Sequence, residues 1–197
     1  MSPPPETYLT KEQYLEIERA AEFKSEYYQG EMFPMGGPFA RAGAKESHNS
    51  VVANLIADLH RQLRPRPCRT YPSDMRIRVG TTAFYTYPDV AVVCGEPKFL
   101  DEKRDTLLNP NLIVEVLSAS TEAYDRGRKF APYQSIESLS EYLLVSSDHV
   151  RADLFTRQPD DRWLLTSASR PEDSLDLTSV DCRITLSGLY EKVDLTA

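Results

Sequence analysis

Two short apolar segments, each carrying one carboxylate, constrain this chain more than any other feature of its sequence. Pro88–Val93 and Leu112–Leu117 are apolar and rich in β-branched residues, which is typical of central strands covered on both faces. Asp89 and Glu115 lie inside these strands or at their edge. Burying a carboxylate without a partner costs several kcal/mol. Each carboxylate must therefore be compensated by a metal ion, a cation or several hydrogen bonds.

Strand alternation predicts that the two carboxylates meet. Glu115 shares a face with Ile113 and Leu117, and Asp89 shares one with Ala91. If the strands are neighbours in register, both carboxylates lie on one face, where they repel unless a divalent cation lies between them. Mg²⁺, or Mn²⁺ in its place, suits such oxygen ligands and can generate a nucleophilic water beside a phosphate. The alternative is structural: each carboxylate caps a turn or strand edge, or pairs with an arginine.

The remaining patterns predict an α/β domain, with an α+β mixed sheet and flanking helices. A capping box at Thr10–Gln13 begins one helix, and an apolar stripe predicts another over residues 51–63. Strands are expected within residues 27–35, 75–79, 88–93, 112–117 and 141–145, and a C-terminal β-hairpin at residues 150–156 and 163–166. A helix begins after residues 118–121, and a short one lies near 186–190. Residues 1–9 form a loose proline-rich leader, and residues 10–197 a single domain.

The charge balance limits any contact with nucleic acid to one part of the surface. Lys and Arg total 23 and Asp and Glu total 30, a net charge of −7, whereas a protein that coats nucleic acid is basic. Between His60 and Val79, however, six arginines oppose the single acid Asp74; they are Arg61, Arg64, Arg66, Arg69, Arg76 and Arg78. Arginine forks suit phosphate geometry. This stretch predicts a local DNA-binding face, and the alternative is a solvated basic face.

Hydropathy and cysteine usage point to the cytoplasm. No apolar run approaches the roughly 20 residues that cross a bilayer, so no membrane contact is expected. The N-terminus lacks the basic head and apolar run of a secretory signal. Cys68, Cys94 and Cys182 are odd in number and far apart, which favours three reduced thiols.

Several short motifs follow one another in a characteristic order. They are Leu9–Leu15, Ser25–Glu31, Ser47–Asn49, Tyr87–Val93, Asn109–Ser118, Asp125, Lys129, Tyr133 and Glu141–Val145. Their order resembles the Uma family of restriction endonucleases, within the PD-(D/E)XK nuclease superfamily. The resemblance implies a restriction-endonuclease-like core with a metal site at one edge of the central strands. It also implies Mg²⁺-dependent hydrolysis of DNA phosphodiester bonds, with Asp89 and Glu115 as the catalytic, metal-holding aspartate and glutamate of the motif.

One position departs from the superfamily pattern. That pattern carries a lysine two residues after the glutamate, where this chain has Leu117. The resemblance points to Lys129 instead, because the Uma pattern carries its lysine in the following helix. Such a lysine would orient the attacking water or stabilise charge on the phosphate. The alternative for Lys129 is a solvated helix lysine beside Arg126 and Arg128.

Other residues complete the candidate site. The superfamily often brings a third acid from the start of the domain, so Glu31 would ligate the metal or hold Lys129, with Glu26 ranked below it. For both glutamates the alternative is an exposed strand edge. His48 lies on the apolar face of its helix and would donate to a phosphate, unless it is a satisfied core histidine. Tyr133 shares a helix face with Lys129, and core packing is its expected role.

Three functions follow as hypotheses. The first is a Mg²⁺-dependent DNA endonuclease, working as a homodimer because a duplex has two strands. The second is a nuclease-derived module that binds DNA or a protein without cutting, which Leu117 and the acidic balance favour; absence of metal binding would distinguish it. The third is glycoside hydrolysis by the carboxylate pair. Its aromatic platform is missing, because the single tryptophan, Trp163, lies in the predicted hairpin.

Overall fold

The computed structural model describes residues 8–35, 45–80, 83–119 and 121–195. Its helices are α1 (Lys11–Ala20), α2 (Glu46–Leu63), the π-helix η1 (Tyr124–Lys129), α3 (Phe130–Tyr133) and α4 (Leu186–Leu189). Its strands are β1 (Ser25–Tyr28), β2 (Glu31–Pro34), β3 (Cys68–Pro72), β4 (Arg76–Val79), β5 (Phe84–Thr86), β6 (Val90–Cys94), β7 (Thr106–Leu107), β8 (Leu112–Leu117), β9 (Glu141–Ser146), β10 (Ala152–Arg157), β11 (Trp163–Ala168), β12 (Ser174–Leu177) and β13 (Cys182–Thr185). Within these described ranges, no helix has both the length and the apolar character that a membrane crossing requires.

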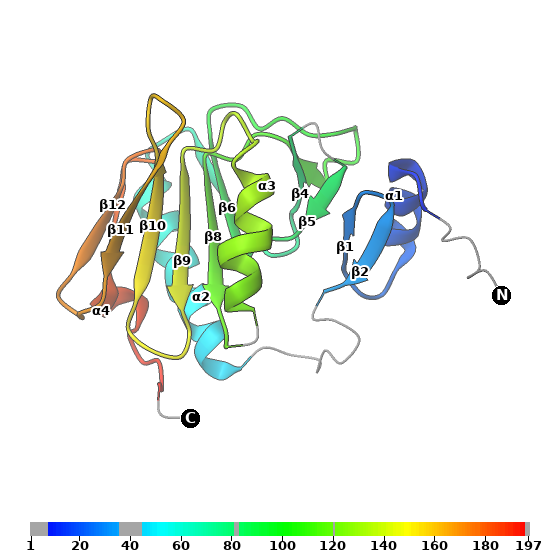
Figure 1. Cartoon of the computed structure of the whole chain (residues 1–197). Helices are drawn as coiled ribbons and strands as arrows, with labels where there is room; N and C mark the ends of the chain where they lie inside the picture. Colours follow the sequence, from blue (N-terminus) through cyan, green and yellow to red (C-terminus); the bar gives the residue numbers. More distant parts are fainter. Residues whose placement is uncertain (1–7, 36–44, 81–82, 120, 196–197) are drawn as a thin grey trace.

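A six-stranded mixed sheet forms the centre of the molecule. Its strand order is β11-β10-β9-β8-β6-β3. Strand β8 pairs in parallel with β9 and antiparallel with β6. Every residue of β8 and β9 is buried, as expected for apolar strands with both faces covered. Figure 1 shows α2 on one face of this sheet and the η1–α3 helix on the other.

The apolar stripe of α2 covers the first face. Val51, Leu55 and Leu59 are fully buried and form one core cluster with Val92 and Val114 of the sheet. Burying each of these leucines contributes about 2 kcal/mol relative to leaving it exposed. The helix ends before a proline, whose ring and missing N–H cannot continue an α-helix.

The opposite face supports the second helix and a second sheet. Ala91 and Ile113 belong to one core cluster with Phe130 and Tyr133 of α3 and Phe84 of β5. The second sheet has five strands in the order β2-β1-β5-β4-β7. In Figure 1 it lies with α1 at one end of the molecule, beyond the η1–α3 helix.

Tyrosine stacking fixes the N-terminal elements on the second sheet. The rings of Tyr14 in α1 and Tyr27 in β1 stack at 4.8 Å between centroids, and Tyr85 packs against both. The Leu9 N–H donates to the Gly30 carbonyl at 2.8 Å, which holds the chain entering α1 against the β1–β2 turn. Residues 1–7 of the predicted leader lie outside the described part of the chain. This packing holds β1 as an inner strand beside β5.

The predicted mixed sheet with flanking helices is confirmed. The capping box at Thr10 is present, and the predicted hairpin forms as β10 and β11, which extend the central sheet. The helix predicted after residue 121 differs, because it is a π-helix followed by a single α-turn. The β12–β13 hairpin was not predicted, since each strand has only four residues.

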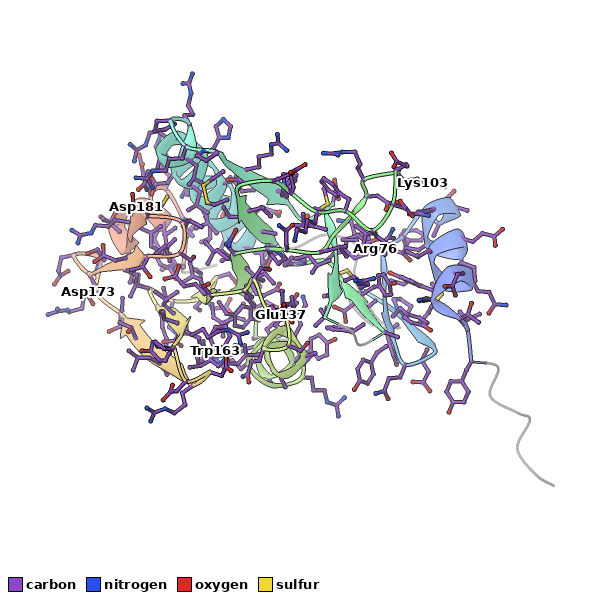
Figure 2. All side chains as sticks on the ribbon, turned by 90° about the horizontal axis from the view of Figure 1, so that it is seen from above. Arg76, Lys103, Glu137, Trp163, Asp173 and Asp181 are labelled. Atoms are coloured by element: carbon purple, nitrogen blue, oxygen red, sulfur yellow. A yellow bond between two sulfur atoms is a disulfide. The ribbon has the colours of Figure 1, made fainter. Side chains whose placement is uncertain are left out.

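The prediction of three reduced thiols is wrong for two of them. Cys68 in β3 and Cys94 in β6 lie opposite each other in the antiparallel register and form a disulfide (Figure 2). Cys182 is free and buried. The two bonded cysteines are 26 residues apart, and only the pairing of β3 with β6 brings them together.

Candidate active site

The pairing of β6 and β8 brings Asp89 and Glu115 together. Val90 lies opposite Val114, so Asp89, one residue before β6, faces Glu115 in the same register. Glu115 is 3% exposed. The Asp89 carboxylate accepts the backbone N–H of Val116 at 2.7 Å, which ties the end of β6 to β8. Two carboxylates therefore converge where two central strands are joined.

Lys129 supplies the cation of this site. It ends η1, and its Nζ lies 2.8 Å from Glu115 Oε1. The same ammonium lies 3.7 Å from Asp125 and 3.8 Å from Glu26. Leu117, at the position where the superfamily pattern has its lysine, is buried in the core beside η1–α3. The lysine thus reaches the glutamate from the following helix rather than from the strand.

Tyrosine and threonine hydroxyls hold the surrounding carboxylates. Tyr133 donates to Glu115 Oε1 at 3.0 Å from a fully buried position. Tyr124 and Thr86 both donate to the Glu26 carboxylate, one from η1 and the other from β5. Glu26 itself comes from β1, so the second sheet contributes directly to the cluster. We call Glu26, Asp89, Glu115, Asp125 and Lys129 the carboxylate cluster.

The carboxylate cluster has four acids and one lysine in a buried setting. Burial raises the pKa of Glu115 well above its usual value, and Lys129 offsets this effect only in part. Burial likewise raises the pKa of Asp125. Burial disfavours the charged form of Lys129, but Glu115, Asp125 and Glu26 outweigh it and raise the lysine pKa. The cluster therefore keeps its ammonium charged and favours the uptake of a further proton or cation.

His48 lies beside the cluster on the first turns of α2. Its Nε2 is 3.5 Å from Asp89 Oδ2. Burial opposes protonation of the ring, but the hydrogen bond and charge of Asp89 outweigh it and raise the histidine pKa. Its Nδ1 is buried and has no hydrogen-bond partner among the described residues. His48 therefore carries one buried nitrogen whose hydrogen-bonding capacity is unused by the rest of the described chain.

Glu31 does not join the site, and Glu26 takes the place predicted for it. Glu31 begins the edge strand β2, opposite Tyr28, and its side chain is exposed. Glu26 lies on the inner strand β1 and is 7% exposed. The structure therefore places Glu26, and not Glu31, beside Lys129; the sequence did not distinguish the two, because a sheet edge cannot be told from a sheet interior in this short hairpin. Asp125 was named in the family resemblance but was given no role in the site, although its position four residues before Lys129 placed both on one helix face.

The donor set fits a hard divalent cation. No three Asp, Glu, His or Cys side chains of the described ranges are arranged to hold a metal ion together. Mg²⁺, however, is commonly bound by one or two carboxylates, with waters and substrate phosphate oxygens completing the shell. Asp89 and Glu115 offer such a pair of oxygen donors, and the excess negative charge of the cluster favours a cation.

The arginine-rich stretch does not form one face. Three of its arginines are held by carboxylates: Arg61 by Asp58, Arg66 by Asp181 and Arg76 by Asp105. Arg76 is 2% exposed. In Figure 2, Arg76 lies toward the α1 end of the molecule and Asp181 at the opposite end. The predicted basic face from Arg61 to Arg78 is therefore divided between two regions, because its first part belongs to α2 and to β3 of the central sheet, whereas Arg76 and Arg78 lie in β4 of the second sheet.

Comparisons with known proteins agree with this fold. The family model Uma2, described as "Putative restriction endonuclease", matches residues 11–187. The chain is 39% identical over 158 residues to the uncharacterized protein sll1609 of Synechocystis sp., covering 80% of this chain and 86% of that protein. It is 37% identical over 183 residues to the uncharacterized protein slr1290 of the same organism, covering 92% and 91%.

A solved structure extends the agreement to three dimensions. The crystal structure of "a putative nuclease belonging to DUF820" from Anabaena variabilis superposes with a TM-score of 0.73 at 15% identity. The match covers 92% of this chain and 97% of that one, so it shows a common fold. The chain belongs to the Uma2 family and has the restriction-endonuclease-like fold.

Proposed function

We propose that this protein is a metal-dependent nuclease that hydrolyses phosphodiester bonds of DNA. One observation carries the proposal: Asp89 and Glu115 face each other on neighbouring strands, with the Lys129 ammonium 2.8 Å from Glu115. Paired carboxylates with a nearby cation are what hydrolysis of a phosphodiester needs. Membership of a family described as restriction endonucleases supports the same activity.

Each residue of the site has a separate task in this proposal. Asp89 and Glu115 would hold Mg²⁺ or Mn²⁺, which supplies a nucleophilic water at neutral pH and neutralises phosphate charge. Lys129 stabilises the negative charge that develops on the phosphate. Glu26 and Asp125 keep this lysine protonated and restrict its position.

The test is nicking of a supercoiled plasmid in Mg²⁺ or Mn²⁺. Glu115→Gln keeps the shape of the side chain but removes its charge, so we expect nicking to fall by a factor of about 10² or more. Glu31→Gln is the matched control, because Glu31 is exposed and outside the cluster. Equal nicking by all three proteins, or none by the parent with either ion, would contradict the proposal.

A second function is favoured by one specific observation. The Lys129 ammonium lies 2.8 Å from Glu115 and so already supplies one positive charge to this carboxylate without a metal ion. The protein would then be a nuclease-derived module that binds DNA or a protein partner without cutting. DNA binding with no nicking and no metal uptake would favour this function over the first.

A further inference from the structure

We propose that a cleft at the edge of the central sheet is a second phosphate-binding site. It is separate from the carboxylate cluster and binds a different part of the backbone of the same nucleic acid. The proposal rests on the proposed function. The cleft has a volume of about 490 Å³ and lies between the end of α2 and strand β3. Its polar lining is His60, Arg64, Arg66, Arg69, Thr70 and Tyr71. None of the described residues that line it is acidic.

Two of these arginines are available to a ligand. Arg66 is held by Asp181 at 2.7 Å and donates to the Val180 carbonyl. Arg64 and Arg69 have no carboxylate within salt-bridge distance in the described ranges. In a protein with a net charge of −7, two such guanidinium groups in one cleft create a local attraction for anions. Their planar forks match the paired oxygens of a phosphate.

The position of the cleft suits a strand of DNA that also reaches the cluster. Arg69 lies opposite Val93 in the β3–β6 register, so it projects from the same face of the sheet as Asp89. Val93 lies four residues after Asp89, so Arg69 and Asp89 are about 13 Å apart along the strand direction, at roughly 3.3 Å per residue. A B-DNA duplex rises by roughly 3.4 Å per base pair along its axis, so this distance corresponds to about four base pairs of a duplex that lies along the strand direction. β3 is the edge strand of its sheet, so no further described strand lies between the cleft and a bound duplex.

A structural explanation for the arginines makes a different prediction. Charged side chains on an edge strand also prevent it from pairing with other chains, and cations complement the C-terminal end of a helix such as α2. In that case Arg64 and Arg69 would affect stability or aggregation but not DNA affinity. The two explanations are separated by a binding measurement.

The experiment measures binding of a fluorescein-labelled DNA duplex by anisotropy, in EDTA so that no cleavage occurs, over a range of salt concentrations. We expect Arg64→Ala with Arg69→Ala to weaken binding roughly tenfold and to lower the salt slope by about 0.9 for each phosphate that the protein no longer neutralises. Lysine at both positions keeps the charge and should restore most of the slope. Arg61→Ala is the matched control, because Arg61 lies in the last turn of α2, pairs with Asp58 and does not line the cleft.

The outcomes decide the proposal. Unchanged affinity and slope in the double variant would overturn it, and so would an equal loss in Arg61→Ala. Each single variant is measured as well. If the melting curve of the double variant is altered, the single variants decide the result in its place. Inorganic phosphate is titrated as a competitor. Binding of free phosphate at the cleft, with no loss of duplex affinity in the variants, would also overturn the proposal. Plasmid nicking is recorded separately, because a protein that never nicks but shows the expected binding pattern contradicts the proposed function and not the cleft.

Discussion

Lys129 is the residue on which the electrostatics of the carboxylate cluster depend. It is 3% exposed, and its ammonium lies 2.8 to 3.8 Å from the three carboxylates of Glu115, Asp125 and Glu26. Leu117, at the position usual for the lysine, packs in the core and leaves that task to η1. A buried charge that loses its partner is strongly destabilising unless it changes protonation.

Replacement of Lys129 by methionine therefore changes activity and stability together. We expect nicking to fall by a factor of about 10² to 10³, because charge on the phosphate is no longer stabilised. We also expect the free energy of unfolding at neutral pH to fall by about 3 kcal/mol and to recover partly as the pH is lowered, because protonation removes the repulsion. Nicking assays and denaturant titrations at several pH values measure both. Lys103→Met, at an exposed position, is the control, and parent-like nicking by the Lys129 variant would contradict its assigned role.

Asp105 gives a stability prediction that is independent of the site. Both of its oxygens accept from Arg19, at 2.7 and 2.9 Å, and Arg76 lies 3.2 Å away. Hydrogen bonds from Arg19 lower the Asp105 pKa from 3.8 to about 2. A lowered pKa in the folded state gives stability that is present above the unfolded value and is lost as the pH falls through the folded value.

The free energy of unfolding of the Asp105→Asn variant should therefore be lower than that of the parent above about pH 4, and the two values should converge toward about pH 2. We expect a loss of about 1 kcal/mol at neutral pH, because a third of the side chain is exposed and solvent screens the ion pair. Urea titrations across this pH range measure the difference. A gap that stays constant down to about pH 2 would contradict the assignment, and Glu102→Gln in the same exposed loop is the control.

Individual site residues could be predicted from the sequence where their immediate sequence neighbours indicated their surroundings. Apolar strands mark Asp89 and Glu115, because a carboxylate is costly within them. Glu26 could not be identified in this way, because its burial depends on the packing of a second sheet against η1. Arg76 was misassigned to a basic face for the same reason, since its partners Thr106 and Tyr87 come from distant parts of the chain.

Among the elements, η1 has the largest influence on the site. It carries Asp125 and Lys129 into the cluster, and α3 continues it to Tyr133. Wide π-turns are rare and occur mostly near functional sites. The helix is held to the central sheet by Arg126, whose guanidinium lies 2.7 Å from the buried Asp153 of β10. The course of this helix was not predictable, because Gly127 and Pro132 both weaken the helical pattern.

Arg126→Ala should loosen this attachment. Asp153 is fully buried and would keep only Arg151 and Ser167 as described side-chain partners, so we expect a loss of about 1 to 3 kcal/mol in unfolding free energy. Nicking should fall as well, because η1 positions Lys129. Arg128→Ala is the matched control on the same helix, with an exposed side chain. Equal stability of the two variants would show that the Arg126 ion pair does not hold the helix.

Across the whole molecule, the fold class followed from the order of helices and strands, but the long-range contacts did not. The Cys68–Cys94 disulfide fastens the edge strand β3 to β6, which leads back to Asp89. It closes a segment with a sequence separation of 26 residues. No cysteine spacing indicates such a bond, because strand pairing alone brings the two residues together.

Removal of this disulfide should lower the stability of the whole domain. Closing a loop of this length contributes about 3.5 kcal/mol in the chain-entropy model, so reduction should lower the melting temperature by roughly 10 °C. The same shift is expected for a Cys68→Ala, Cys94→Ala protein, and a reductant should then have no further effect. An unchanged melting temperature on complete reduction, verified by thiol counting, would contradict this contribution.

The central claim is that Asp89 and Glu115 form one site for a divalent cation. Calorimetric titration of Mn²⁺ into the parent, Asp89→Asn, Glu115→Gln and Glu31→Gln proteins tests it most directly. We predict a saturable binding isotherm for the parent and for Glu31→Gln, and loss of that isotherm in both other variants. Metal binding that persists in Asp89→Asn and Glu115→Gln, or that is absent from the parent, would contradict the claim.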